Sequence, residues 1–245
     1  MSSQSVARLA VAVVLVVSVG CGGGGGGGGG ASGGPSGPPT STSVEIMVDI
    51  SRAIDVPAQT TDIEWSVSVL KSGVPVNTAS VTINGKVVPP VGGFSDGWYR
   101  LYFFQSPANT SGQATYLVGQ AYTVTVAVDG TNYTDTMKAP GGVTVDATGS
   151  SVAWPEQGTY ASVHVRHLFG SETFSAPLPS PAALSSPLAI PASAYPGAGT
   201  YEITAGVQNI RLPAGAYPGF GYFDSLVGHL THFVIEDFRV QRFTK

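Results

Sequence analysis

The chain has very little of several features that define common classes of protein. Its 245 residues include one cysteine, so no disulfide can form within the chain. Eleven basic residues stand against fifteen acidic ones without any local cluster, which excludes a basic nucleic-acid-binding surface. The apolar run 9–19 has eleven residues, too few for a membrane-spanning helix, which needs about 20. No ten-residue window has the period of an amphipathic helix.

What is present favours β-structure outside the cytoplasm. Charged residues are 11% of the chain, and Gly, Pro, Ser and Thr are abundant, which is typical of extracellular β-sheet domains rather than of a cytosolic helical enzyme. Removal of residues 1–20 takes away Arg8 and leaves ten basic and fifteen acidic side chains, a formal charge of −5. The remaining 225 residues are enough for two small domains, which packing alone must stabilise.

The first 20 residues are organised as a secretory signal. A short polar stretch with Arg8 precedes the apolar run 9–19, and a small residue precedes Cys21. Ser18-Val19-Gly20-Cys21 resembles the lipobox of bacterial lipoproteins, in which the cysteine thiol receives a diacylglyceryl group before cleavage. Ser18 stands where Leu is usual, and an ordinary signal peptide is the alternative. The resemblance implies lipid attachment at Cys21 and export to a bacterial membrane.

Residues 21–43 are expected to be the lipidated cysteine and a flexible tether. Nine glycines follow Cys21, and the rest of the segment holds nothing apolar larger than Ala or Pro to bury. As a random coil, the 22 residues after Cys21 would span about 26 Å. Gly22 stands where an aspartate retains enteric lipoproteins in the inner membrane, so the resemblance favours the outer membrane or the cell surface.

From Val44 onward the apolar residues recur with a period of two, which predicts strands. The alternation is clearest in 44–50, 64–69, 80–83 and 122–128. Turn signals separate these runs: Asn84-Gly85, Gly92-Gly93, Asp129-Gly130 and Gly141-Gly142. Short strands at this spacing predict an all-β protein of antiparallel β-sandwiches. We place one sandwich at 44–140 and a second at 141–245.

The first range carries a finer pattern. A Gly73-Val-Pro75-Val76 turn is followed by a strand from Ala79 and by the strand entry Asp96-Gly97-Trp98-Tyr99. This pattern resembles the carboxypeptidase regulatory-like (prealbumin-like) and related Ig-like repeats of bacterial surface proteins. The resemblance implies a non-catalytic spacer, stability or binding unit.

The second range resembles a fibronectin type III or related Ig-like domain. Residues 143–147 and 151–155 are similar to its first two strands, with Trp154 in the core. Further strands are expected at 161–167, at 199–207 through a Tyr-containing corner, and at 232–243. The loops 177–196 and 212–224 are either tolerated insertions or a binding surface. The expected architecture is therefore two Ig-like β-sandwiches after a disordered Gly-rich tether.

Candidates for catalysis and metal binding have simpler structural explanations. The sequence 93–97 matches G-x-S-x-G, but a nucleophile elbow needs a following helix, and the residues after it are expected to form a strand. His164/His167 and His229/His232 have a spacing that puts the members of each pair on opposite faces of a strand. A zinc site would need the two pairs to meet. The oxygen-rich segment 129–135 lacks full EF-hand spacing, so a hairpin turn is favoured over calcium.

Aromatic residues crowd the segment 98–104. Trp98, Tyr99 and Tyr102 are candidate ligand-binding residues, because an exposed aromatic platform can grip sugars or a partner protein. The alternative is a central strand that is covered on both faces.

The sequence thus predicts a lipid-anchored, exported, non-catalytic β-sandwich protein that serves as a surface display, adhesion or assembly component. It predicts no cofactor, no metal and no nucleic acid. The expected partners are the membrane, through the lipid on Cys21, and a surface protein or glycan. A carbohydrate-binding surface lipoprotein is the alternative, and a metal-dependent hydrolase is a more distant one.

Overall fold

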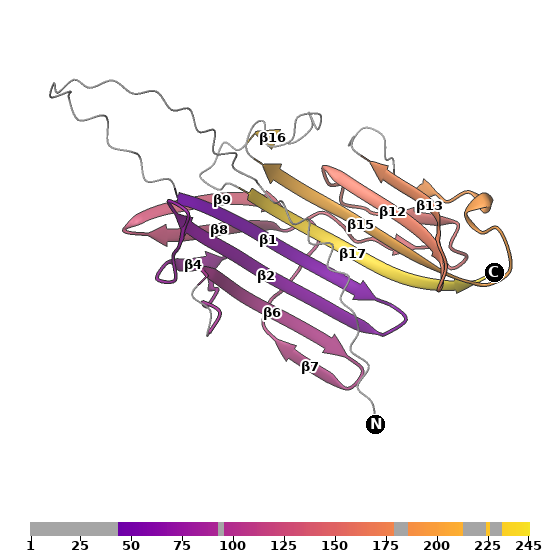
Figure 1. Ribbon diagram of the computed structural model, residues 1–245, viewed down its shortest axis with the longest axis horizontal. Helices are drawn as coiled ribbons and strands as arrows, with labels where there is room; N and C mark the ends of the chain where they lie inside the picture. The colour runs from indigo at the N-terminus through magenta and orange to yellow at the C-terminus, as the bar shows by residue number, and fades with distance from the viewer. Residues whose placement is uncertain (1–43, 93–95, 179–185, 213–223, 226–231) are drawn as a thin grey trace, which may run out of the picture. The chain divides into compact units, whose positions relative to one another are not determined.

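The alternating segments form strands that lie side by side (Figure 1). The computed structural model describes residues 44–92, 96–178, 186–212, 224–225 and 232–245. Their strands are β1 (Val44–Asp55), β2 (Thr60–Lys71), β3 (Val74–Pro75), β4 (Ser80–Ile83), β5 (Lys86–Val87), β6 (Trp98–Ser106), β7 (Asn109–Gly112), β8 (Ala121–Val128), β9 (Thr131–Lys138), β10 (Thr144–Val145), β11 (Ser151–Ala153), β12 (Tyr160–His167), β13 (Glu172–Leu178), β14 (Leu188–Ala189), β15 (Thr200–Leu212), β16 (Asp224–Ser225) and β17 (His232–Thr244). A 3₁₀ turn, η1 (Ala192–Ala194), lies between β14 and β15. The predicted all-β class is confirmed.

One large sheet and two small sheets make up this part of the chain. The large sheet has the order β13-β12-β15-β17-β1-β2-β6-β7, with β3 paired to β2 and β16 paired to β15. The small sheets have the orders β5-β4-β8-β9 and β10-β11-β14. Each small sheet packs on the large sheet across a hydrophobic core, as a β-sandwich does.

The first core lies between the β5-β4-β8-β9 sheet and strands β17, β1, β2 and β6. Val124 and Val126 of β8 meet Val48 and Ile50 of β1 in it, and Trp65 packs edge-on against the Tyr122 ring. Each fully buried side chain of this size contributes about 1.5–3 kcal/mol. The core therefore holds the two layers together without a disulfide, as the sequence requires.

The second core lies between the β10-β11-β14 sheet and strands β12 and β15. Trp154 is buried in it, which confirms its predicted place. Tyr201 is buried there too, and its hydroxyl donates to the Gly197 carbonyl at 2.9 Å.

Both cores cover the same face of the large sheet. Ile235 of β17 belongs to the first core, and Asp237, two residues further along, is aligned with Val207 of the second core. Residues two apart on a strand point to the same face. The opposite face, which we call the outer face, carries the even-numbered residues of β6, β2 and β17 and the odd-numbered residues of β1.

The strand pairing joins the two predicted ranges. β17, from 141–245, pairs in parallel with β1, from 44–140, over Met47–Asp55. Phe233 and Ile235 of β17 pack in the first core. The large sheet therefore continues across the predicted boundary at 140/141, and one strand serves both cores. The β1–β17 pair is parallel within a mainly antiparallel sheet, because the chain end returns beside the first strand.

Two predicted hairpin turns have the expected backbone. Asn84 and Gly85 have φ of 51° and 75°, and Asp129 and Gly130 have φ of 50° and 80°. Positive φ at both central residues defines the type I′ turn, which suits the twist of a two-residue hairpin. These turns set the β4–β5 and β8–β9 hairpins.

Candidate functional site

The candidate site is a strip of side chains on the outer face of β6. Trp98, Arg100 and Tyr102 project from this face because they alternate along the strand. The Trp98 side chain remains 43% exposed and that of Tyr102 50% exposed. Two large aromatic rings thus stay in contact with solvent on either side of a cation. This arrangement can stack flat apolar groups and donate hydrogen bonds between them.

Tyr99, the third predicted aromatic, is not part of this strip. It is 1% exposed and lies in the first core. Its hydroxyl accepts a hydrogen bond from the Ala79 amide at 2.8 Å and donates one to the Val76 carbonyl at 2.9 Å. Burial raises the pKa of this phenol. Its odd number puts it on the opposite face from Trp98 and Tyr102, so its assignment to a surface platform is corrected to a structural role.

Small side chains on the neighbouring strand leave the Trp98 ring standing above the sheet, whereas Tyr102 is aligned with Glu64. Trp98 is aligned with Ser68 of β2, and Ser68 is aligned with Met47 of β1. Ser68 is buried, whereas Met47 and Trp98 on its two sides are partly exposed. Arg100 is aligned with the buried Ser66. The side chains of the outer face are therefore short at Ser66 and Ser68 of β2 and long at Trp98 and Arg100 of β6.

The charge of Arg100 is matched within the strip. Its guanidinium donates to the Glu64 carboxylate on β2 and forms an ion pair with it. Both side chains are partly exposed, so the pair contributes little to stability. Because the two charges cancel, the pair adds no net charge to this surface.

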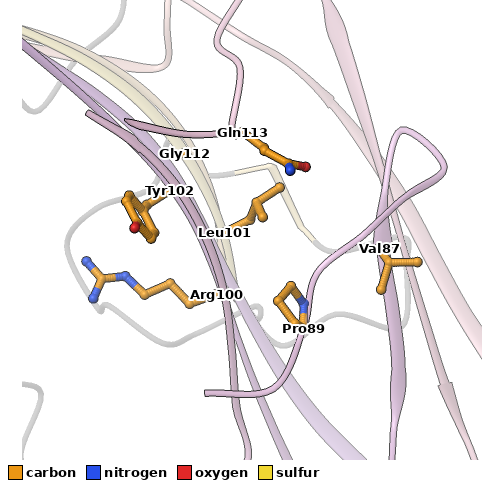
Figure 2. A pocket seen from close by; sticks show the side chains of 7 residues that line it. All are labelled: Val87, Pro89, Arg100, Leu101, Tyr102, Gly112 and Gln113. Atoms are coloured by element: carbon orange, nitrogen blue, oxygen red, sulfur yellow. The ribbon is translucent and has the colours of Figure 1, made fainter. Parts of the chain in front are cut away.

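A groove of about 440 Å³ opens at the edge of β6 (Figure 2). It is lined by Val87, Pro89, Arg100, Leu101, Tyr102, Gly112 and Gln113. Arg100 and Tyr102 project on one side of β6 and Leu101 on the other (Figure 2). The groove lies where β6 changes its edge partner, from the 89–91 segment to β7.

The change of partner leaves a backbone acceptor at the groove. The Arg100 amide donates to the Pro89 carbonyl at 2.9 Å. In an antiparallel pair of this kind the partner amide returns the bond, but Pro89 has no N–H. The Arg100 carbonyl therefore faces the groove without a bond from its strand partner.

The other side of the groove is held by a close approach of two backbones. Gly112 has φ of 91°, and a Cβ at this position would lie 2.1 Å from the Tyr102 carbonyl oxygen. That same oxygen accepts from the amides of Gln113 at 2.6 Å and Ala114 at 3.1 Å. Tyr102 is thus fixed by backbone contacts while its ring stays exposed. Glycine is needed at 112 because any side chain would displace the strand.

A group of carboxyls lies further along the outer face, over β1 and β17. Glu236 is aligned with Ser51 of β1, and Ser51 is aligned with Glu64 of β2. Burial, with the charge of Asp49, raises the pKa of Glu236 to about 8, although a hydrogen bond from Gln208 at 2.7 Å opposes this. Burial and then the charge of Glu64 raise the pKa of Asp49 to about 6. These carboxyls repel one another when they are all ionised.

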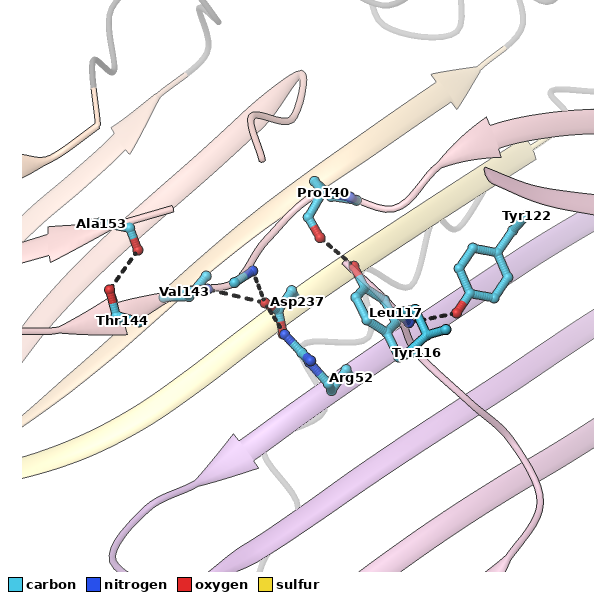
Figure 3. Close-up of polar contacts among 10 residues, drawn as sticks. Arg52, Tyr116, Leu117, Tyr122, Pro140, Val143, Thr144, Ala153 and Asp237 are labelled. Carbon is cyan, nitrogen blue, oxygen red and sulfur yellow. Dashed lines mark hydrogen bonds and ion pairs between the residues drawn. The ribbon is translucent and has the colours of Figure 1, made fainter. Parts of the chain in front are cut away.

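A second polar cluster holds the two cores together (Figure 3). Asp237 of β17, 1% exposed, accepts from Arg52 Nε and Nη2, each at 2.7 Å. Its Oδ2 also accepts from the amides of Gly142 at 2.8 Å and Val143 at 3.3 Å. The Arg52 guanidinium lies 4.8 Å from the centre of the Tyr116 ring. The Asp237 carboxylate is bonded to Arg52 and to two backbone amides, so we assign the cluster a structural role.

The histidines take separate places. His164 Nδ1 lies 2.8 Å from a Glu172 carboxylate oxygen. His164 is aligned with Thr204 of β15, and Thr204 is aligned with Val240 of β17, eight residues from His232. Burial lowers the pKa of His232. His229 falls outside the described residues. Within the part of the chain that the structure describes, no group of three or more His, Cys, Asp or Glu is placed to hold a metal ion.

The segment 129–135 forms the turn and start of a hairpin, as favoured above. Asp129 pairs with Lys71, and Asp135 pairs with Arg211 of β15 at 2.6 Å. The two carboxylates therefore point to different partners.

Other predicted features fall on residues for which the structure gives no description. These are the signal, Cys21 and the tether (1–43), Gly93–Ser95 of the G-x-S-x-G match, and parts of both long loops (179–185 and 213–223). The residues after Gly97 form the strand β6 and not the helix that a nucleophile elbow needs, as the sequence predicts.

Arg100, Pro89 and Gln113 were not singled out by the sequence. Arg100 could have been found, because it shares the even numbering of Trp98 and Tyr102. Pro89 and Gln113 could not, because their place beside β6 depends on which segments pair with its edge.

No protein-family model matches the chain, and no curated protein matches it. Among the described residues, none forms a helix long and apolar enough to cross a membrane.

Proposed function

We propose that the chain is an exported lipoprotein whose β-sandwich is a non-catalytic binding module for surface display, adhesion or assembly. The observation that carries this proposal is the exposure of Trp98 and Tyr102 on one face of the large sheet, while Tyr99 between them is buried. Exposed aromatic rings on a rigid strand are typical of contact surfaces, because they supply area at a low cost in conformational entropy.

The proposed anchor is the lipid on Cys21. The first strand begins at Val44, so 22 residues separate the cysteine from the folded part. A Gly-rich coil of this length spans about 26 Å, which allows the sheet to stand away from a membrane surface. One lipidated residue together with the tether accounts for display at a membrane surface.

The continuous large sheet supports a mechanical role. β17 pairs with β1 on one side and with β15 on the other, so force applied to either core passes through strand pairs. The bidentate Arg52–Asp237 pair lies at the same seam. A component of an adhesive or assembled surface benefits from such a junction because its two cores cannot swing independently.

A second candidate function is the capture of glycans by the exposed aromatics. The groove beside Tyr102 favours it, because small-molecule sites combine apolar walls with a few placed polar groups.

Metabolic labelling with palmitate and cell fractionation test the anchor. Wild type and Ser32→Ala, a matched change within the tether, are expected to take up label and to fractionate with membranes. Cys21→Ala is expected to take up none and to leave the membrane fraction. An unlabelled wild type, together with a membrane-bound Cys21→Ala variant, would contradict the proposal.

A further inference from the structure

We infer that the outer face of β6 binds an uncharged oligosaccharide, with Trp98 and Tyr102 as two stacking platforms. This inference rests on the proposed binding function and names its ligand class. The C–H faces of pyranose rings are flat and apolar, and they pack on exposed aromatic rings that stand clear of their neighbours. Trp98 stands above the buried Ser68, and Tyr102 stands beside the groove.

The spacing of the two rings sets the size of the ligand. Four residues along a strand correspond to about 13 Å between the Cα atoms of Trp98 and Tyr102. A single sugar cannot touch both rings, whereas a chain of several sugars can follow the strand from one to the other. Arg100 lies between them on the same face, where its guanidinium can reach hydroxyl oxygens of the units in the middle.

Polar groups at the groove fit the hydroxyls of such a chain. The Arg100 carbonyl lies opposite Pro89, which has no N–H to donate to it. The exposed Gln113 side chain on the opposite rim can both donate and accept. Sugar hydroxyls need donors and acceptors together, and the edge of β6 beside the aromatic strip offers both.

The charges favour an uncharged glycan over an acidic one. Arg100 is the charged residue among those that line the groove, and Glu64 pairs with it. An acidic sugar would have to displace the Glu64 carboxylate or lie beside it. An uncharged sugar leaves the pair intact and uses the remaining guanidinium N–H groups.

The site is organised before the ligand arrives. The Tyr102 carbonyl is held by two amides, and the tight contact with Gly112 fixes the strand at this point. Binding therefore costs little free energy for ordering the backbone, which suits a shallow surface that makes few contacts.

Affinity electrophoresis of the purified full chain in detergent tests the inference. Native gels would contain hydroxyethyl cellulose, laminarin, galactomannan or arabinoxylan as uncharged probes, and polygalacturonate or dextran sulfate as acidic ones. We expect at least one uncharged polysaccharide to retard wild type. Trp98→Ala and Tyr102→Ala are each expected to weaken that retardation about tenfold, since each removes one stacking surface.

Phe169→Ala is the matched control, because Phe169 is a fully exposed aromatic in the turn between β12 and β13. It should bind as wild type does, and unchanged melting temperatures of all three variants would show that the fold is kept. Retardation that survives both Trp98→Ala and Tyr102→Ala would overturn the inference. So would retardation by the acidic probes alone, or by none of the six.

A fluorescent polyproline peptide gives the competing outcome. If it binds through Trp98 and Tyr102 while no polysaccharide does, the strip is a protein-docking surface, and the glycan inference is overturned while the binding module stands. The palmitate experiment is independent of both results, so failure of the anchor and failure of the ligand class are distinguishable.

Discussion

Arg52 and Asp237, 185 residues apart in the chain, meet in a bidentate ion pair across the parallel seam between β1 and β17. Asp237 also accepts from two amides of the segment that leads from the first core to the second. Loss of the arginine would leave a buried carboxylate without its counter-charge. We expect Arg52→Met to lower the free energy of unfolding by about 3–5 kcal/mol, measured by chemical denaturation.

The matched control is Lys71→Met, because Lys71 forms an ion pair with Asp129 in which both side chains are exposed. It should lower the free energy of unfolding far less than Arg52→Met does, because solvent screens the exposed pair. Equal losses in the two variants would show that the seam does not depend on the buried pair.

The carboxyls of the outer face predict a stability that declines as the pH rises. Burial and neighbouring charge raise the pKa of Asp49 to about 6 and that of Glu236 to about 8, from ordinary values near 4. A raised carboxyl pKa favours the protonated form in the folded state. The stabilisation that these two carboxyls contribute is therefore fully present below about pH 4 and is lost as the pH rises to about 8. Above that pH, both carboxyls are ionised and the stability no longer changes on their account.

The charged groups that face Glu236 are Asp49 on β1 and Glu64 on β2. Glu236→Gln removes the most affected carboxyl, and its amide oxygen can still accept from Gln208. We expect the melting temperature of this variant to change by several degrees less between pH 4.5 and 8.5 than that of wild type. Glu45→Gln, at an exposed position, is the control. A wild-type melting temperature that rises over this range would refute the assignment.

The two tyrosines of β6 should differ in their response to loss of the hydroxyl. Tyr99→Phe removes both hydrogen bonds to the 76–79 segment and should cost about 1–3 kcal/mol of unfolding free energy. Tyr102→Phe changes an exposed ring and should stay within about 0.5 kcal/mol of wild type. Thermal or chemical unfolding of the two variants in parallel provides the comparison. A larger loss in Tyr102→Phe would mean that the faces of β6 are assigned the wrong way round.

Local chemistry explains what could be predicted. The period of two and the paired turn residues at Asn84-Gly85 and Asp129-Gly130 act within a few residues, so strands and hairpins are readable from the sequence. The same rule of alternation separates Tyr99 from Trp98 and Tyr102. It places Tyr99 in the core, although the crowding of aromatics in 98–104 kept Tyr99 among the predicted ligand-binding residues.

The amino-acid sequence by itself determined the all-β class and the hairpins, because each depends on neighbouring residues. The tertiary structure decided that β17 returns beside β1, that Asp237 meets Arg52, and that Pro89 and Gln113 border the strip on β6. Those contacts join segments far apart in the chain, and hydrogen-bonded strand edges accept many sequences as partners. Strand periodicity states which face a residue occupies, but the packing of the whole chain selects the neighbour.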